Sequence, residues 1–518
     1  MCKISKIIVA VSLFFCGCQA DSGSLLPGQW SVKKANIWYA KQSWVVGCNF
    51  LPSTAINDVE MWQSETFDAE TIEKELAMAR EWGMNSVRVF LNYVVWEAEA
   101  EALKKNFRVF LDIAEKYGLS VMPILFDDCN FSGNVATFGK QQEPVPCVHN
   151  SGWVSSPPRS MVTDPDAYPK LKAYVQDMVK TFRKDKRIII WDLYNEPGQV
   201  GEKSFDLTEK TFEWAREVKP SQPLTTGLWA NYHGEKSQLL LDISDIVSFH
   251  SYEDAAGVEA VIKRCAEAGR PILCTEWLLR QGDNTPQTIL PIFKKHKVGA
   301  YNWGLVEGKT QTYMPWGSPR NAPKPRLWQH DLIRSDGAPY REAEYYFFRH
   351  IIFGEKEPEI PPIEIIILLP TSEDKQLPWK YTESEPTANW FETNFSDANW
   401  KTGNAPFGTI EPEIKRNPGT VWTSEKIWLR TTFELTDEQI NLISKPGEIV
   451  LLTHYDENAE VYINGRLASK LMGYNAAYGE IDLMPETIET LKAGKNTLAV
   501  SVTNNSGGQY FDMGLIKY

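Results

Sequence analysis

The chain has 518 residues, of which 43% are hydrophobic and 23% are charged. This is the composition of an ordinary globular protein that is too long for one compact core, so two or three domains are expected. The formal net charge of −13 argues against nucleic acid as a partner, because phosphate binding needs a basic surface. No Cys/His spacing matches a zinc site.

The N-terminus has the pattern of an export signal. Lys3 and Lys6 precede an apolar stretch over residues 7–15 that is too short to span a bilayer. The Gly-Cys pair that ends at Cys18 resembles a bacterial lipobox, in which this cysteine is lipidated and becomes the first residue of the mature chain. Cleavage of an ordinary signal peptide nearby is the alternative. We expect residues 19–29 to be a flexible tether and the protein to be anchored in the bacterial cell envelope, periplasmic or surface-exposed.

Short apolar strands alternate with amphipathic helices between residues 45 and 353. The expected strands are Val45–Phe50, Ser86–Phe90, Ser120–Phe126, Ile188–Tyr194, Leu224–Gly227, Ile246–His250, Ile272–Thr275 and Gly299–Trp303. The expected helices are Ala69–Trp82, Phe107–Tyr117, Leu171–Phe182, Leu207–Val218, Val258–Ala268 and Arg341–Ile352. This α/β alternation predicts a closed (β/α)8 barrel. The rival is an open doubly wound sheet, which usually has a Gly-rich turn after its first strand, and residues 49–53 lack one.

The residue pattern of the sequence changes after the expected barrel. Residues 354–378 contain repeated prolines and an Ile-rich strip, which indicates a linker that packs against a surface. Beyond it, Trp428–Phe433 and Ala459–Ile463 alternate with period two, and Asn464-Gly465 is a strong hairpin signal. The second domain is therefore expected to be an antiparallel β-sandwich, specifically a jelly roll. The expected division is a lipoprotein signal peptide (1–18), a tether (19–29), a catalytic barrel (30–353), a linker (354–378) and a sandwich (379–518).

The cysteines leave one question open. Cys48, Cys265 and Cys274 lie in expected strands or a helix, so we expect buried free thiols. Cys129 and Cys147 flank one long loop of an exported protein. A disulfide between them is conceivable, but connectivity cannot be read from sequence.

Polar side chains stand where the expected barrel strands end. Strand four ends in Asn195-Glu196-Pro197, and strand seven ends in Glu276. A carboxylate at the end of a buried strand has no packing role, because burying an unpaired charge is costly. Barrel enzymes place their sites at these strand ends. Two carboxylates there are the minimal equipment for hydrolysing a glycosidic bond.

Four further side chains share this edge of the barrel. They are Arg88, His250, Tyr252 and Trp303. Taken singly, each has a structural alternative: a buried cation that pairs with any carboxylate, a core histidine, or an aromatic ring in the core. Taken together, they place a cation, an imidazole, a phenol and an aromatic plane beside two carboxylates at one mouth.

With these motifs the barrel resembles a clan A retaining glycoside hydrolase, closest to family 5, the cellulase and mannanase family. The resemblance implies that Glu276 is the nucleophile and Glu196 the acid/base. It implies that Asn195 binds the sugar 2-OH and that the Trp303 ring forms the floor of the sugar-binding subsite. Arg88, His250 and Tyr252 would support the site, without a metal or organic cofactor. The family also expects a histidine after strand three, for which His149 is the candidate.

The resemblance implies hydrolysis of O-glycosidic bonds, β-linked by expectation, in an oligo- or polysaccharide by double displacement. The expected partners are a carbohydrate substrate and, through lipidated Cys18, a bacterial membrane. The alternative is a non-catalytic glycan-binding lipoprotein with a decayed barrel. The C-terminal part is similar to the galactose-binding-like jelly roll of family 2 enzymes, at Trp428–Arg430 and Val461–Gly465. The long segment 127–165 and the aromatic cluster Tyr313–Trp316 are expected to shape the cleft.

Overall fold

A computed structural model describes residues 25–229, 234–318, 320, 325, 327–359, 365–373, 375–410, 418–444, 448–474 and 478–518. Cys18 and the rest of the predicted export signal lie outside the described residues. Among the described residues, no helix is both long enough and apolar enough to cross a bilayer.

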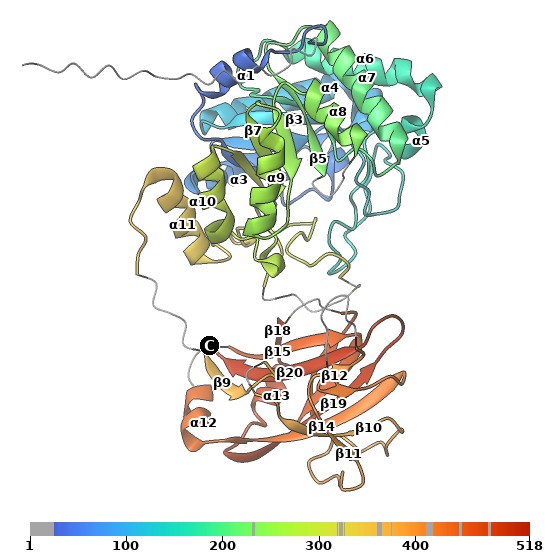
Figure 1. Cartoon of the computed structure of the whole chain (residues 1–518), viewed down its shortest axis with the longest axis vertical. Coiled ribbons are helices and arrows are strands. Elements are labelled where there is room, and N and C mark those ends of the chain that lie inside the picture. The colour runs from blue at the N-terminus through green and yellow to red at the C-terminus, as the bar shows by residue number, and fades with distance from the viewer. Residues whose placement is uncertain are drawn as a thin grey trace, which may run out of the picture.

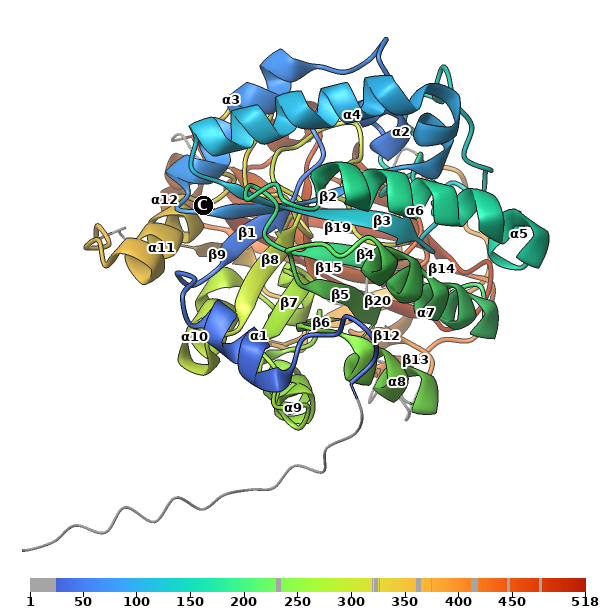
Figure 2. The same ribbon diagram turned by 90° about the horizontal axis from the view of Figure 1, so that it is seen from above.

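The first part of the chain forms a closed barrel of eight parallel strands in sequential order, as the alternation of strands and helices predicts. Figures 1 and 2 show its strands surrounded by helices. The strands are β1 (Val46–Asn49), β2 (Ser86–Phe90), β3 (Ser120–Asp127), β4 (Trp191–Asn195), β5 (Leu224–Trp229), β6 (Val247–His250), β7 (Ile272–Trp277) and β8 (Gly299–Trp303).

The helices of this part each place buried apolar residues in a hydrophobic cluster that also contains strand residues. They are α1 (Val32–Tyr39), α2 (Asp58–Trp62), α3 (Ala69–Glu81), α4 (Tyr93–Lys116), α5 (Arg159–Val162), α6 (Tyr168–Phe182), α7 (Glu202–Glu217), α8 (Glu235–Ile243), α9 (Ala255–Ala266), α10 (Pro286–His296) and α11 (Glu342–Phe353), with 3-10 turns η1 (Pro165–Ala167) and η2 (Arg280–Gly282).

Two differences from the expected helices have local causes. Helix α4 begins at Tyr93, capped by Asn92, and not at Phe107; Glu99 has non-helical φ/ψ inside it, which interrupts the apolar periodicity. Helix α10 was not expected, and it contains Pro291, a residue that normally ends a helix. A capping box at Thr285 starts α10 and stabilises it.

The C-terminal part forms two sheets that share one hydrophobic core. The first has the order β11-β10-β14-β19-β16-β17, and the second has β13-β12-β20-β15-β18 with β9 on β20. Leu429 and Val500 of the first sheet pack in the same cluster as Leu451 and Leu515 of the second. Most pairings are antiparallel, and β12 pairs with β13 in parallel. The jelly-roll topology itself stays a prediction.

The bounds of the elements in this part are β9 (Ile366–Leu369), β10 (Pro378–Thr382), β11 (Lys401–Asn404), β12 (Phe407–Gly408), β13 (Thr420–Val421), β14 (Lys426–Leu435), α12 (Asp437–Ile443), β15 (Ile449–Asp456), β16 (Asn458–Ile463), β17 (Arg466–Leu471), β18 (Gly479–Asp482), α13 (Pro485–Ile488), β19 (Gly494–Thr503) and β20 (Tyr510–Lys517).

Two sequence expectations for this part can be compared with the structure. The Asn464-Gly465 turn joins β16 to β17, and both residues have positive φ, as a tight hairpin requires. The interval expected to be a linker contains β9, whose apolar residues extend the second sheet by pairing with β20. The sheets therefore include residues that precede the expected boundary at 379.

The two parts of the chain meet on the side of the barrel where its strands end. The loops that follow β3 and β8 lie on the barrel face that is turned toward the C-terminal sheets (Figure 1). In the loop after β8, Gly317 lies beside Tyr474, whose hydroxyl is 3.8 Å from the position a Cβ would take on that glycine.

Candidate active site

The register of the barrel strands brings the predicted site residues to one level. Arg88 pairs laterally with Asn49, and Asn49 with Trp303. His250 pairs with Glu276 across β6 and β7. Glu196 follows β4 directly and has φ 45°, a left-handed conformation that is uncommon for a residue with a side chain. Parallel strand ends thus place these side chains around one mouth.

Glu276 receives a hydrogen bond on each carboxylate oxygen. Arg88 Nη1 donates to Oε1 at 3.0 Å, and the Tyr252 hydroxyl donates to Oε2 at 2.8 Å. Burial and the neighbouring Glu196 carboxylate raise the pKa of the Glu276 carboxyl, whereas Arg88 and the Tyr252 hydroxyl act to lower it. The arginine and the phenol therefore favour the ionised form that a nucleophile requires.

Arg88 is fully buried and is held from three sides. Its Nε and Nη2 donate to Asp192 Oδ2 at 3.0 and 2.8 Å. Its Nη1 also donates to Asn49 Oδ1 at 2.7 Å, and Nη2 to Asn195 Oδ1 at 2.6 Å. The guanidinium plane is thereby fixed, and the buried cation is paired by Asp192 and Glu276.

Glu196 has a different set of neighbours. Its Oε1 lies 2.7 Å from Nδ1 of His250. Its Oε2 accepts from Gln199 Nε2 at 2.8 Å and from the Cys129 thiol at 3.3 Å. Burial raises the pKa of the Glu196 carboxyl, and the Cys129 thiol, the more distant Arg88 and the Gln199 amide oppose that rise only in part. Among the described residues, Glu196 forms no ion pair with a lysine or arginine, whereas Glu276 pairs with Arg88, so Glu196 is the better suited of the two glutamates to hold a proton.

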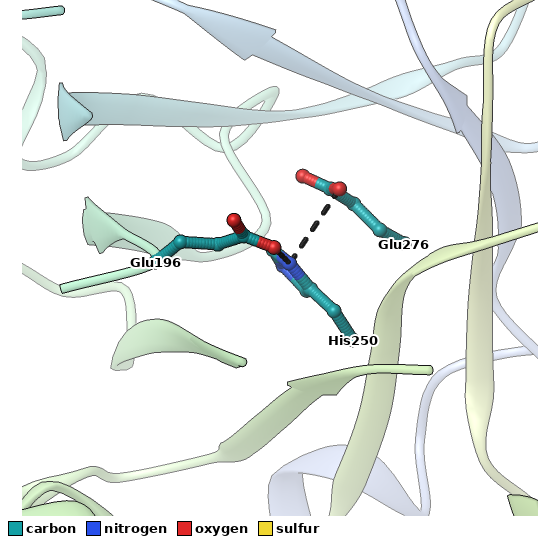
Figure 3. A group of neighbouring side chains, drawn as sticks. All are labelled: Glu196, His250 and Glu276. Carbon is teal, nitrogen blue, oxygen red and sulfur yellow. Dashed lines mark hydrogen bonds and ion pairs between the residues drawn. The ribbon is translucent and has the colours of Figure 1, made fainter. Parts of the chain in front are cut away.

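His250 lies between the two glutamates (Figure 3). Burial lowers the pKa of its imidazole to about 4, so the ring is neutral at pH 7. One ligand atom from each of Glu196, His250 and Glu276 lies within 4.8 Å of the others. These three atoms could in principle hold a metal ion. The Glu276 oxygens, however, already accept from Arg88 and Tyr252, and the buried guanidinium opposes a second cation. The arrangement is better suited to proton transfer.

A cavity of about 120 Å³ opens beside both glutamates. The loop after β3 contributes Cys129, Phe131, His149, Asn150 and Trp153 to its lining, and the other lining residues are Asn195, Glu196, Tyr252, Glu276, Trp303 and Trp316. The expectation that segment 127–165 shapes the cleft agrees with this lining. In the aromatic cluster after β8, Trp316 lines the cavity, whereas Tyr313 packs against Trp328.

The structure brings all seven predicted site residues together: Arg88, Asn195, Glu196, His250, Tyr252, Glu276 and Trp303. His149 also lines the cavity, but its Nδ1 lies 2.8 Å from the Met314 carbonyl oxygen, and its ring lies beside His330. Cys129 and Cys147 are free thiols, as are the buried Cys48, Cys265 and Cys274.

Sequence reasoning missed several supporting residues. Asp192 carries a detectable signal, because it is a carboxylate inside the apolar run of strand four. Asn49 stands at the end of β1 and could have been included with the other strand-end residues. Cys129, Gln199 and Asn150 belong to loops without periodicity, and their contacts with the site depend on loop conformation.

A family model described as cellulase (glycosyl hydrolase family 5) matches residues 47–308, just over half of the chain. The chain belongs to glycosyl hydrolase family 5. The matched residues include all eight barrel strands except the first residue of β1. A search of the curated proteins gives no significant match.

Several solved structures are similar to this family 5 chain. The exo-β-1,4-mannosidase Op5Man5 from Opitutaceae bacterium strain TAV5 is 16% identical, with 64% of this chain and 62% of that chain covered and a TM-score of 0.43. GH5_18 from Streptomyces cattleya, in complex with GlcNAc, is 15% identical, with 61% and 82% covered and a TM-score of 0.42. The endo-β-1,4-mannanase from Thermotoga petrophila is 13% identical, with 92% and 98% covered and a TM-score of 0.43.

Family membership identifies this protein as a glycosidase that acts on a carbohydrate substrate. The alternative of a decayed, non-catalytic barrel is not favoured by the site, since both glutamates and the side chains that support them are present.

Proposed function

We propose that this family 5 enzyme is a retaining glycosidase that hydrolyses β-linked bonds of an oligo- or polysaccharide by double displacement. The observation that carries the proposal is the separation of the glutamates, whose nearest ligand oxygens lie within 4.8 Å. Retaining enzymes hold their two carboxyl groups about 5–5.5 Å apart, whereas inverting enzymes need about 6.5–9.5 Å to admit a water.

In the first step, an oxygen of Glu276 attacks the anomeric carbon and the glycosidic bond breaks. Glu196 gives its proton to the departing oxygen, so the leaving group departs as an alcohol. In the second step, Glu196 takes a proton from water, the water oxygen attacks the anomeric carbon, and the ester to Glu276 breaks. Arg88 and Tyr252 stabilise the carboxylate that is released.

Two further residues contact the sugar in this proposal. Asn195 lines the cavity, and its Nδ2 donates to Asp127 Oδ1 at 2.8 Å and, in a longer contact, to Cys129 Sγ at 3.6 Å; the sugar 2-OH would replace the sulfur as acceptor of the second hydrogen. Trp303 offers its ring as the floor, held edge-on by Phe90 and Trp153. The β configuration of the bond is supported by the family description, because cellulases cleave a β-linked glucan.

The proposal is tested by the stereochemistry of the product. A panel of aryl β-glycosides is screened with the wild type, and the first-formed sugar is followed by proton NMR before mutarotation. A β-anomer as the first product is expected. An α-anomer would overturn retention. Glu196→Gln and Glu276→Gln should both lose at least about a hundredfold in kcat/KM, while Glu115→Gln, at an exposed position of α4 away from the cavity, serves as the control.

We also propose that the enzyme is anchored in the bacterial cell envelope through an acyl group on Cys18. The support is the short apolar stretch that ends in Gly17-Cys18. The tether from residue 19 to 29 would then place the barrel close to the membrane surface.

A further inference from the structure

One side of the catalytic cavity is closed by two loops that are hydrogen-bonded to each other. The Asn150 N–H donates to the Thr310 carbonyl at 2.8 Å. Gln311 accepts from the Cys147 N–H at 2.7 Å and donates to the Val145 carbonyl at 2.8 Å. The loop after β3 and the loop after β8 therefore form one wall, even though their contacting residues are about 160 positions apart.

The same wall is tied to the loop after β1. The Lys309 N–H donates to the Ser53 carbonyl at 3.0 Å. Gly308 permits this approach, because a Cβ there would lie 2.4 Å from Ser53 Cα. Three loops are thus joined next to Asn150 and Thr310, which border the space behind Trp303 where Glu196 does not reach.

The free volume on one side of the catalytic cavity is much smaller than that on the other. Behind Trp303 the described residues leave about 30 Å³, bordered by Asn150, Trp153 and Asp331. This is enough for a water or a hydroxyl group and too little for a second sugar ring. On the opposite side, about 920 Å³ opens beside Glu196, Gln199 and Trp229.

The roles of the two glutamates show which part of the substrate occupies each space. Glu196 protonates the leaving oxygen and borders the large space, so the leaving group occupies that side. The sugar that becomes bonded to Glu276 occupies the cavity of about 120 Å³. The cavity of about 120 Å³ is smaller than the roughly 150 Å³ that holds one benzene ring, so it has room for no more than one six-membered sugar ring, part of which extends through the open side toward the leaving group.

Asn150 stands where the far edge of that ring would lie. It borders both the catalytic cavity and the small space behind Trp303. Its side chain is 99% buried (1% exposed), and neither Oδ1 nor Nδ2 has a hydrogen-bond partner among the described residues. A buried amide without partners is costly, and sugar hydroxyl groups both donate and accept. Its backbone is fixed by Thr310, so the amide is held in place for a ligand.

We infer that this glycosidase acts from the chain end: it removes one sugar unit at a time from the non-reducing terminus, and the Asn150 amide binds hydroxyl groups of that terminal sugar. The inference rests on the proposed roles of Glu196 and Glu276. A longer chain on the glycone side would collide with the wall formed by the loops after β1, β3 and β8.

The test uses β-linked gluco-, manno-, xylo- and galacto-hexasaccharides that carry a fluorescent label at the reducing end. With the hexasaccharide that the wild type cleaves, free monosaccharide and labelled pentasaccharide should appear first, followed by labelled tetrasaccharide. Labelled di- or trisaccharide as the first product would overturn the inference. If Glu276→Gln abolishes that internal cleavage, the proposed mechanism stands while chain-end action fails; if Glu276→Gln cleaves as fast as the wild type, the mechanism itself fails.

Asn150→Ala tests the binding role separately. We expect kcat/KM for the aryl β-glycoside that the wild type cleaves to fall about 10- to 100-fold, because the site loses a partner for a substrate hydroxyl. The melting temperature should fall only slightly, since removing a buried amide without partners is favourable, whereas φ 48° at this position suits Asn better than Ala. Asn134→Ala, at an exposed position of the same loop, should change neither quantity. Unchanged kcat/KM with a lower melting temperature in Asn150→Ala would show a purely structural role and refute the assignment.

Discussion

Replacing Tyr252 with Phe removes one defined interaction, the 2.8 Å hydrogen bond from the phenol to Oε2 of Glu276. A hydrogen bond to a charged group contributes about 1.5–3 kcal/mol, and one pKa unit corresponds to about 1.36 kcal/mol. The Glu276 pKa should therefore rise by about one to two units, because the lost donor favoured the ionised carboxylate. Arg88 stays on the other oxygen, and neutral His250, 3.5 Å from Oε2, replaces only part of the loss.

The assay is the pH dependence of kcat/KM, whose acid limb reports the ionisation that the nucleophile requires. In Tyr252→Phe this limb should move by about one to two units toward higher pH, and the rate on the limb should fall about tenfold or more. Tyr174→Phe is the matched control, because its hydroxyl donates to the Leu125 carbonyl and contacts neither glutamate. An acid limb that does not move in Tyr252→Phe would refute the reasoning that this phenol holds Glu276 ionised.

Three further predictions concern other groups. Cys129→Ala removes the thiol donor from Glu196, so the alkaline limb of the same profile should move to higher pH by less than about one unit while the acid limb stays in place; movement of the acid limb instead would reverse the assignment of the glutamates. Burial raises the pKa of Asp331 to about 7 from an unfolded value near 4, so its contribution to the free energy of unfolding declines as pH rises between these values. The melting temperature of Asp331→Asn relative to wild type should therefore be higher at pH 8 than at pH 4.5, and a difference independent of pH would contradict the buried-acid explanation. Labelled palmitate should enter the wild type expressed in bacteria and not Cys18→Ala, and equal labelling of both would exclude lipidation at this cysteine.

The barrel could be predicted from the sequence because its strands are buried on both faces and read as continuous apolar runs. The expected bounds of β2 and β8 agree with the structure. Helix α4 was predicted too short, since the kink at Glu99 interrupts the periodicity on which such predictions depend. Helix α8 has no comparable interruption and was nonetheless not predicted.

The residues of the candidate site could be predicted where a polar side chain stands at a position that packing alone would fill with an apolar one. Glu196 and Glu276 are conspicuous because a carboxylate at the end of an apolar strand has no structural purpose, and their shared barrel edge follows from the parallel strands. Asp192 carried the same signal inside strand four and was overlooked. The contact of Asn150 with Thr310 could not be predicted, because it joins two aperiodic loops whose conformations depend on the whole barrel.

The most direct test of the central claim is azide rescue of the two glutamate variants on an activated aryl β-glycoside that the wild type cleaves. In Glu276→Ala, azide should enter the space of the missing carboxylate, restore turnover and give the α-glycosyl azide, with inverted configuration. In Glu196→Ala, azide should attack the sugar bonded to Glu276 and give the β-glycosyl azide, with retained configuration. A β-azide from Glu276→Ala, or full activity in either variant without azide, would contradict the assignment of Glu276 as nucleophile and Glu196 as acid/base.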